Sequence, residues 1–203
     1  MSRVGPRDPR SIGLTPRRSL SDLLWIANTR HGPGGHWFAR VIRDEGDHDH
    51  LVSAPQTVKY LADHRVSLPS EEVTPRQLRS LADIRSMVRA LLDPGVGWTP
   101  TVRAILDRAR FRVDADGGLV ADGSGWDAFI GDLMVPLLQI VESRERLRIC
   151  GNPNCRLIFL DLSKNRARLW CDNAGCGNRD RVRRYRSRAK VRKPATTTNQ
   201  TGT

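Results

Sequence analysis

The sequence lacks the features that place a chain in or across a membrane. No stretch of its 203 residues is apolar over the roughly 18 residues that a membrane-spanning helix needs. Residues Met1–Thr15 are polar, contain Arg, Pro and Gly, and hold no apolar run of a secretory signal. From these absences we expect a cytoplasmic protein with no membrane partner, in which thiols stay reduced.

The sequence also lacks the common motifs of enzymes. It contains no Gly-rich phosphate loop, no Gly-x-Ser-x-Gly nucleophile elbow and no His-Glu-x-x-His pattern. We therefore predict no catalytic residue. An enzyme that acts on a small molecule through its N-terminal part is the weakest of the functional hypotheses.

Cysteine is scarce, and its few copies are paired. The four cysteines form two Cys-x4-Cys pairs, and they are Cys150, Cys155, Cys171 and Cys176. Each pair encloses Gly and Asn, which we expect to supply the tight or left-handed backbone conformations of two turns. All five histidines precede Arg65, so the C-terminal site has cysteine ligands only. Four thiolates predict a closed, tetrahedral site for one structural zinc ion per chain.

Three alternatives to a zinc site would also account for four cysteines. Two disulfides would require an oxidising compartment, which the N-terminal sequence does not indicate. Iron, alone or in an iron–sulfur cluster, is the second alternative, although no redox-partner signature accompanies the cysteines. Four unrelated core cysteines are the third, and the paired spacing argues against them.

The positive charge of the chain is concentrated around the cysteines. The formal net charge is +12, and residues 144–193 hold 16 Lys and Arg against 4 Asp and Glu, while the remainder is balanced. A basic patch of this density is typical of nucleic-acid binding. A solvated basic tail is the simpler alternative. An anionic membrane surface fits less well, because the segment has no bulky apolar face.

Further residues around the cysteines complete a recognisable pattern. The tetrapeptide Cys-Gly-Asn-Arg occupies 176–179, and the other matching positions are Phe159, Asp161, Ser163, Arg168, Trp170, Arg183, Tyr185, Arg186 and Arg188. This pattern resembles the CGNR zinc finger, which is named for the tetrapeptide. The resemblance implies that the finger binds DNA. Proteins with this finger usually carry an N-terminal helical domain called ABATE and are regarded as stress-induced transcription regulators.

The residues before 144 predict a mainly α-helical domain. Apolar residues at helical spacing predict helices over about 19–29, 55–64, 74–93, 99–109 and 124–141, and Pro136 is expected to kink the last. The alternating segment 111–120, with Asp116-Gly117, predicts one β-hairpin. Residues 25–30 resemble the Asn-Thr signature that opens the ABATE domain. The segment 50–55 resembles its second motif inexactly, because His50 stands where an acid is expected.

These features divide the chain into four parts. We expect a disordered basic arm over 1–17, an ABATE-like helical domain over 18–145, a CGNR-type zinc finger over 146–193 and a disordered tail over 194–203. The finger is predicted to contain two short strands around the first cysteine pair and a basic helix from Arg179 to about Val191. Trp170 is expected to pack over the metal site.

Four residues of the N-terminal domain are candidates for a ligand or regulatory site. Three of them lie in the Asn-Thr signature, namely Asn28, Thr29 and Arg30. Asn28 and Thr29 either hydrogen-bond the end of their helix or line a pocket. Arg85 lies among the inward positions of its helix, where an arginine needs a paired acid. It forms a structural salt bridge, extends its charged end to the rim of the core, or holds an anionic ligand.

The basic helix supplies the candidate DNA-binding residues. They are Asn178, Arg179, Arg181, Arg183, Arg184, Arg186, Arg188 and Lys190, since guanidinium groups suit bidentate contacts to phosphate and guanine. Asn178 is alternatively placed to hydrogen-bond a zinc thiolate or to cap the helix. Val182, Tyr185 and Ala189 lie between the arginine rows and are expected to pack on the finger.

Together these observations predict a nucleoid-associated, zinc-dependent transcription regulator that binds double-stranded DNA. Its N-terminal domain would bind a small-molecule effector or form a homodimer. The main alternative is a zinc-stabilised protein that binds RNA or the ribosome, in which the same arginines contact the RNA backbone. Base-specific footprints on a promoter would separate these two hypotheses.

Overall fold

The chain is mainly helical, as its sequence predicts. The computed structural model describes residues 15–16, 18–31, 48–93, 95 and 97–191. The helices of the N-terminal part are α1 (Leu20–Ala27), α2 (Ala54–Asp63), α3 (Pro75–Ala90), α4 (Pro100–Arg108), α5 (Gly125–Asp132) and α6 (Met134–Glu142). The predicted arm before residue 15 and the predicted tail after residue 193 lie outside the described residues.

The helices begin where their capping residues predict. Ser19 accepts a hydrogen bond from the Asp22 amide, and the Asp22 carboxylate accepts one from the Ser19 amide. Thr74 and Gln77 form the same reciprocal arrangement at the start of α3. Thr99 caps α4 through the amide of Val102. These local hydrogen bonds satisfy backbone donors that would otherwise have no partner.

The predicted helix over 124–141 is divided into α5 and α6 at Leu133. Pro136 has no backbone N–H, so it cannot bond to the carbonyl of Asp132 four residues earlier. The helix is therefore interrupted at Leu133, next to the carbonyl that lacks its donor, and not at Pro136 itself. Pro136 instead lies buried inside the first turn of α6, where proline is tolerated.

The apolar core lies between α1, α3, α5 and α6. Its fully buried members include Leu23, Ile26, Leu81, Ile84, Leu133, Leu137 and Ile140. Trp126 and Phe129 of α5 pack edge to face in the same core. Burial of this apolar surface is the main favourable contribution to folding of the helical part.

The N-terminal part contains more β-structure than the single predicted hairpin. That hairpin is present as β4 (Phe111–Val113) and β5 (Gly118–Ala121), with Gly117 at a φ of +78° in the turn. A short strand β1 (Thr15–Pro16) adds parallel to β5, so these two residues of the predicted disordered arm lie in a strand. A second antiparallel pair joins β2 (Arg30–His31) to β3 (His48–Asp49).

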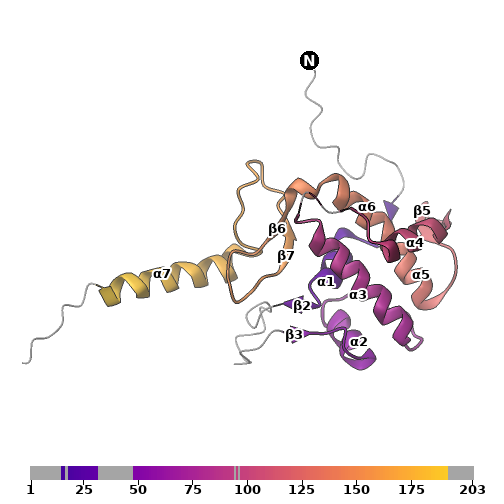
Figure 1. Ribbon diagram of the computed structural model, residues 1–203, viewed down its shortest axis with the longest axis horizontal. Helices are drawn as coiled ribbons and strands as arrows, with labels where there is room; N and C mark the ends of the chain where they lie inside the picture. Colours follow the sequence, from indigo (N-terminus) through magenta and orange to yellow (C-terminus); the bar gives the residue numbers. More distant parts are fainter. Residues whose placement is uncertain (1–14, 17, 32–47, 94, 96, 192–203) are drawn as a thin grey trace, which may run out of the picture.

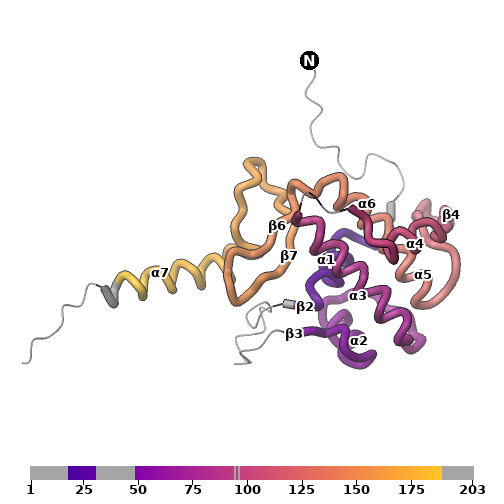
Figure 2. The backbone as a smooth tube through the Cα atoms, in the orientation of Figure 1, coloured from indigo at the N-terminus to yellow at the C-terminus, as the bar shows by residue number. Residues whose placement is uncertain are grey.

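The C-terminal part follows a 3₁₀ turn, η3 (Arg144–Arg146), and begins with two antiparallel strands, as predicted. These are β6 (Leu147–Ile149) and β7 (Ile158–Leu160). They lie between the helical part and the final helix α7 (Asn178–Val191), which extends away from the rest of the chain (Figures 1 and 2). Leu147 and Ile158 belong to the same core as the N-terminal helices. The predicted boundary between 145 and 146 therefore crosses one continuous core.

Among the described residues, no helix has both the length and the apolar character required to span a bilayer.

Candidate metal centre

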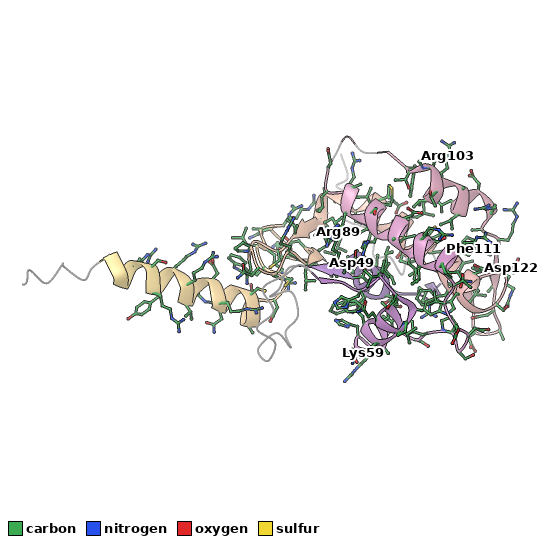
Figure 3. The ribbon with its side chains drawn as sticks, turned by 60° about the horizontal axis from the view of Figure 1, so that its bottom comes forward. Asp49, Lys59, Arg89, Arg103, Phe111 and Asp122 are labelled. Carbon is green, nitrogen blue, oxygen red and sulfur yellow. The ribbon has the colours of Figure 1, made fainter. Side chains whose placement is uncertain are left out.

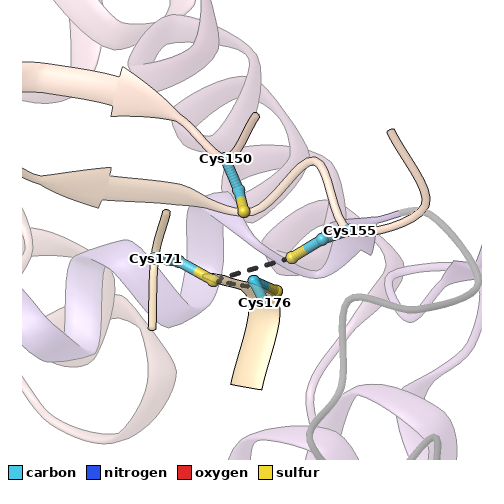
Figure 4. A group of neighbouring side chains, drawn as sticks. All are labelled: Cys150, Cys155, Cys171 and Cys176. Atoms are coloured by element: carbon cyan, nitrogen blue, oxygen red, sulfur yellow. Dashed lines mark hydrogen bonds between the residues drawn. The ribbon is translucent and has the colours of Figure 1, made fainter. Parts of the chain in front are cut away.

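The four cysteines come together between the hairpin β6–β7 and the start of α7 (Figure 4). Cys150 directly follows β6, and Cys155 lies in the turn that leads to β7. Cys171 ends the long loop after β7, and Cys176 lies in the short π-helical turn η4 (Asn173–Gly177). All four Sγ atoms lie within 4.8 Å of one another. The paired spacing in the sequence therefore does produce one cluster.

The distances between the sulfurs fit a tetrahedral zinc site. The Sγ of Cys171 lies 3.7 Å from that of Cys155 and 3.7 Å from that of Cys176. Four sulfurs bonded to zinc at about 2.3 Å would be about 3.8 Å apart. A disulfide needs about 2.05 Å, and all four cysteines are free. The disulfide alternative is wrong, and the clustering equally excludes four unrelated core cysteines.

The electrostatics of the cluster call for a cation. Hydrogen bonds with the Cys150, Cys155 and Cys171 thiols, together with the positive charge of Arg179, hold the pKa of Cys176 below its ordinary value. Hydrogen bonds with the other three thiols, and burial, raise the pKa of Cys155. The sulfurs thus compete for protons, and four thiolates cannot share this volume unless a cation lies among them. A zinc ion held by these four cysteines would supply two positive charges at that point and would keep all four ligands deprotonated.

The turns of the two cysteine pairs are shaped by polar side chains. The side-chain oxygen of Asn152 accepts a hydrogen bond from the backbone amide of Asn154 at 3.1 Å. The backbone carbonyl of Asn152 accepts one from the backbone amide of Cys155 at 2.9 Å. In the second pair, the Asp172 carboxylate accepts hydrogen bonds from the amides of Ala174 and Gly175 at 3.1 and 2.7 Å. These bonds fix the directions of the cysteine side chains.

The enclosed Gly and Asn residues lie in tight turns, one of the two conformations predicted for them, and none of them has a positive φ. The residue with positive φ is Arg156, at +56°, directly after the first pair. The glycines matter for close approach instead. A Cβ on Gly151 would lie 3.0 Å from Cζ3 of Trp170, and a Cβ on Gly177 would lie 3.0 Å from its Cδ1. Trp170 packs against the cluster, as predicted.

Asp161 organises the loop that joins the two cysteine pairs. Its buried carboxylate accepts hydrogen bonds from the amides of Ser163 and Arg168, each at 2.9 Å. Hydrogen bonding with Ser163 is the main reason why the pKa of Asp161 lies below its ordinary value, and it outweighs the opposing effect of burial. The bonds turn the chain after β7 so that Trp170 and Cys171 return to the cluster. The sequence pattern identifies Asp161 but not this role.

Arg179, and not Asn178, donates a hydrogen bond to the metal cluster. Its Nη2 lies 3.2 Å from the Sγ of Cys176. Asn178 is exposed and begins α7, where its backbone N–H bonds to the carbonyls of Asn173 and Gly175. A guanidinium beside a thiolate offsets part of the negative charge that four thiolates place around one zinc ion.

Replacing Arg179 is therefore expected to weaken zinc binding. For Arg179→Ala we expect the zinc dissociation constant to rise about 10- to 100-fold, the usual effect of removing a group that supports a metal ligand. Competition with a chromophoric chelator measures this constant. Arg181→Ala is the matched control, because Arg181 is exposed and makes only a 3.5 Å contact to the Asn173 carbonyl. Equal zinc affinity in both variants would contradict the assignment.

Two of the predicted DNA-binding arginines are paired within α7. Asp180 is buried, at 4% exposure, and its carboxylate lies 2.5 Å from Nη2 of Arg183 and 2.7 Å from Nε of Arg184. Arg186 and Arg188 are exposed and have no ion pair or hydrogen bond within the described part of the chain. Lys190 lies in α7 beyond the last described side chain. The predicted set therefore contains arginines that are paired with Asp180 and arginines that are exposed without such a pair, and its member Lys190 is not described.

The prediction that the apolar residues of α7 pack on the finger is wrong. Tyr185 is 75% exposed and Val182 is 39% exposed. Figure 3 shows the side chains of α7 projecting into open space on both sides of the helix. Helical spacing places these residues on one face of α7. Among the described residues of this helix, however, only Asp180, near its N-terminal end and on the opposite face, is buried. The Ala189 side chain lies outside the described residues.

Asn28 links the helical part to the finger. Its side chain donates to the carbonyl of Ile158 at 2.9 Å and accepts from the amide of the same residue at 2.7 Å, both in buried positions. The Asn28 amide thus pairs with β7 as a neighbouring strand would. The backbone carbonyl of Asn28 accepts a hydrogen bond from the Tyr60 hydroxyl at 2.9 Å, and burial raises the pKa of that tyrosine, so it stays protonated.

The other three N-terminal candidates take structural positions. Thr29 is fully buried and donates its hydroxyl to the carbonyl of Ile26 at 2.7 Å. Arg30 is exposed in β2, and its carbonyl accepts a hydrogen bond from Arg89. Arg85 pairs with Asp49 at 2.6 Å. The contacts of Arg89 and Arg85 join α3 to β2 and β3.

The charge on Asp49 is consistent with this salt bridge. Burial tends to raise the pKa of Asp49, but the hydrogen bond from Arg85 and the amide of Leu51 hold it below its ordinary value. The Arg85 side chain is 12% exposed. Of the three roles considered for Arg85, the contacts favour the structural salt bridge.

Residues 146–189 match the family model of the CGNR zinc finger. This match spans less than a quarter of the 203-residue chain and does not reach the N-terminal helices. The ABATE-like assignment of 18–145 stays a prediction. No curated protein matches the chain. Because the matched family is a zinc finger and the sulfurs have tetrahedral spacing, zinc is favoured over iron, with one ion per chain.

Proposed function

We propose that the chain is a zinc-dependent regulator of transcription that binds double-stranded DNA through α7. In this proposal it is a regulator and not an enzyme. Zinc has a structural role, because all four positions of the tetrahedron are taken by protein thiolates and none is open to a substrate. The metal fixes the start of α7 through Cys176, which lies two residues before that helix.

The observation that carries this proposal is the exposure of α7. All residues from Arg181 to Arg188 are exposed, and five of these eight are arginines. A helix that packs on so little protein and holds so many guanidinium groups is suited to a polyanion. The net charge of +12 on the whole chain arises from residues 144–193, which include α7.

The N-terminal helices are proposed to regulate the finger or to form a dimer. Their core includes Leu147 and Ile158, and Asn28 bonds directly to β7. A change at the end of α1 would therefore be transmitted to the finger through bonded groups. A small-molecule effector and a homodimer are both compatible with this arrangement. In either case the helical domain would control how the finger binds DNA.

The salt dependence of DNA binding tests the proposal. With five to eight phosphate contacts, we expect a slope of log affinity against log salt of about −5 to −7. Changing Arg186 or Arg188 to alanine should reduce this slope by about one unit each. Changing Arg183 or Arg184 should have a smaller effect, because Asp180 already offsets part of their charge. Fluorescence anisotropy with a labelled duplex measures these slopes.

Arg103→Ala is the matched control for these variants. Arg103 is an exposed arginine of α4, in the part of the molecule far from α7 (Figure 3). Its removal lowers the net charge by the same amount but should leave the slope unchanged. Equal slopes for the chain and for the Arg186 and Arg188 variants would contradict the proposal. Tighter binding to an RNA duplex of the same sequence would favour an RNA-binding protein instead.

A further inference from the structure

The exposed apolar residues of α7 form a narrow stripe along the helix. Val182 and Tyr185 are three residues apart, and residues at this spacing lie on one face of a helix. Tyr185 is 75% exposed and Val182 39% exposed, and a contiguous exposed apolar surface rimmed by polar groups marks a site for a partner. The partner must be compatible with the groups on either side of the stripe.

Arginines flank this stripe on both sides. A helix turns by about 100° per residue, so the stripe has Arg181 and Arg188 on one flank and Arg179 and Arg186 on the other. Asp180 lies on the opposite face of the helix, where it pairs with Arg183 and Arg184. The acid is thus kept away from the stripe, and the face around Val182 and Tyr185 carries positive charge only.

The major groove of B-form DNA matches this face in width and in charge. The groove is about 12 Å wide and admits one α-helix, and two phosphate backbones border it, one for each row of arginines. Its floor carries the methyl groups of thymine, which favour apolar side chains. The major groove of an RNA duplex is too narrow for a helix. Two copies of α7 packed through the stripe would bring arginine rows together and repel each other.

We infer that α7 lies in the major groove of B-form DNA with Val182 and Tyr185 against the base edges, so that Tyr185 determines specificity by contacting thymine methyl groups. This inference rests on the proposed function and adds the groove, the face of the helix and the base that is recognised. In this arrangement the flanking arginines contact phosphates and supply most of the affinity. The apolar stripe supplies the preference between sequences.

Replacing thymine with uracil tests the inference, because it removes only the 5-methyl group. The zinc-loaded full chain is first used to select duplexes from a random DNA library. Thymines in the selected duplex are then replaced by uracil one at a time. We expect at least one replacement to weaken binding about fourfold, the effect of losing one buried methyl group.

The Tyr185 variants show whether that discrimination comes from the stripe. Tyr185→Ala should bind the thymine and uracil duplexes equally and keep its salt-dependent binding to unselected DNA. Tyr185→Phe should keep the discrimination, since the ring remains. Val113→Ala is the control, because Val113 is an exposed valine of β4. Tyr185 is largely exposed, so these variants are expected to fold normally.

Several results would overturn the inference while leaving DNA binding intact. These are selection of a site without thymine, equal binding of all uracil duplexes by the unmodified chain, and discrimination that persists in Tyr185→Ala. A dimer that becomes a monomer in Tyr185→Ala, measured by analytical ultracentrifugation, would assign the stripe to self-association. If the zinc-loaded chain binds no duplex at all, the proposed function itself fails, and the inference fails with it.

Discussion

Removal of zinc with a chelator is expected to unfold the finger and to lower the melting temperature of the whole chain. Structural zinc sites contribute apparent binding free energies on the order of 10–16 kcal/mol. The apolar cluster around the cysteines contains few other residues, namely Phe159, Leu157 and Trp170. Such a cluster is too small to hold the finger together without metal.

The effect should extend beyond the finger, although not to the whole helical part. Leu147 and Ile158 pack in the common core, so loss of the hairpin β6–β7 uncovers part of that core. The contacts among α1, α3, α5 and α6 do not involve the metal. Helical circular dichroism should therefore fall partially on chelation, and the remaining signal should melt at a lower temperature than in the zinc-bound chain.

Cysteine variants provide the control for this experiment. Cys155→Ser should show the lowered melting temperature without a chelator, and addition of the chelator should change it little further. Elemental analysis should give one zinc per chain for the unmodified protein. Unchanged melting on chelation would contradict a structural metal, and complete loss of helical signal would contradict a core that is stable on its own.

The helical part is well predicted by the sequence because its signals are local. Ser19 with Asp22 and Thr74 with Gln77 form caps between residues three positions apart. The Asp116-Gly117 turn defines the hairpin in the same way. The cysteine cluster was also predictable, because two matched pairs and the absence of nearby histidine leave few other arrangements.

Features that depend on distant partners could not be predicted in this way. The strand β1 pairs with β5 about one hundred residues later, and two residues carry too little pattern to indicate a strand. Val182 and Tyr185 were expected to be buried because apolar spacing on a helix indicates a buried face. That rule assumes that protein lies beside the helix, whereas α7 extends away from the rest of the chain (Figure 1).

Asn28 is the clearest case of a role that the sequence cannot show. The Asn-Thr signature indicates that Asn28 matters, and a helix end and a pocket are the two roles that its local sequence suggests. Its partner Ile158 is 130 residues away in the chain. An asparagine side chain offers a donor and an acceptor side by side, and together they satisfy both backbone groups of one residue of a strand. Only the folded arrangement reveals this match.

Replacement of Asn28 with alanine is expected to destabilise the chain strongly. Ile158 is 1% exposed, so its N–H and C=O would lose their partners in a site closed to water. Each unsatisfied buried group costs about 1–3 kcal/mol, so we expect a loss of about 2–6 kcal/mol in the free energy of unfolding. Urea unfolding of the zinc-bound protein measures this loss.

Two further variants separate the hydrogen bonds from other effects. Asn178→Ala removes an exposed asparagine and should change the stability by less than about 0.5 kcal/mol. Asn28→Asp keeps the shape of the side chain but replaces the donor with an oxygen that faces the Ile158 carbonyl. It should therefore be no more stable than Asn28→Ala, since a carboxylate is also costly to bury. Asn28→Asp with the stability of the unmodified chain would contradict the role of these two hydrogen bonds.

Hydrogen exchange at Ile158 locates the effect of the Asn28→Ala substitution. In the unmodified chain the Ile158 amide is bonded to Asn28 and should exchange slowly. In Asn28→Ala it should exchange faster than the other amides of β6 and β7, because the hairpin keeps its own pairing but loses its attachment to α1. Uniform acceleration across the whole chain would show that the substitution only lowers global stability. A selective change would show that Asn28 holds the zinc finger against the helical core.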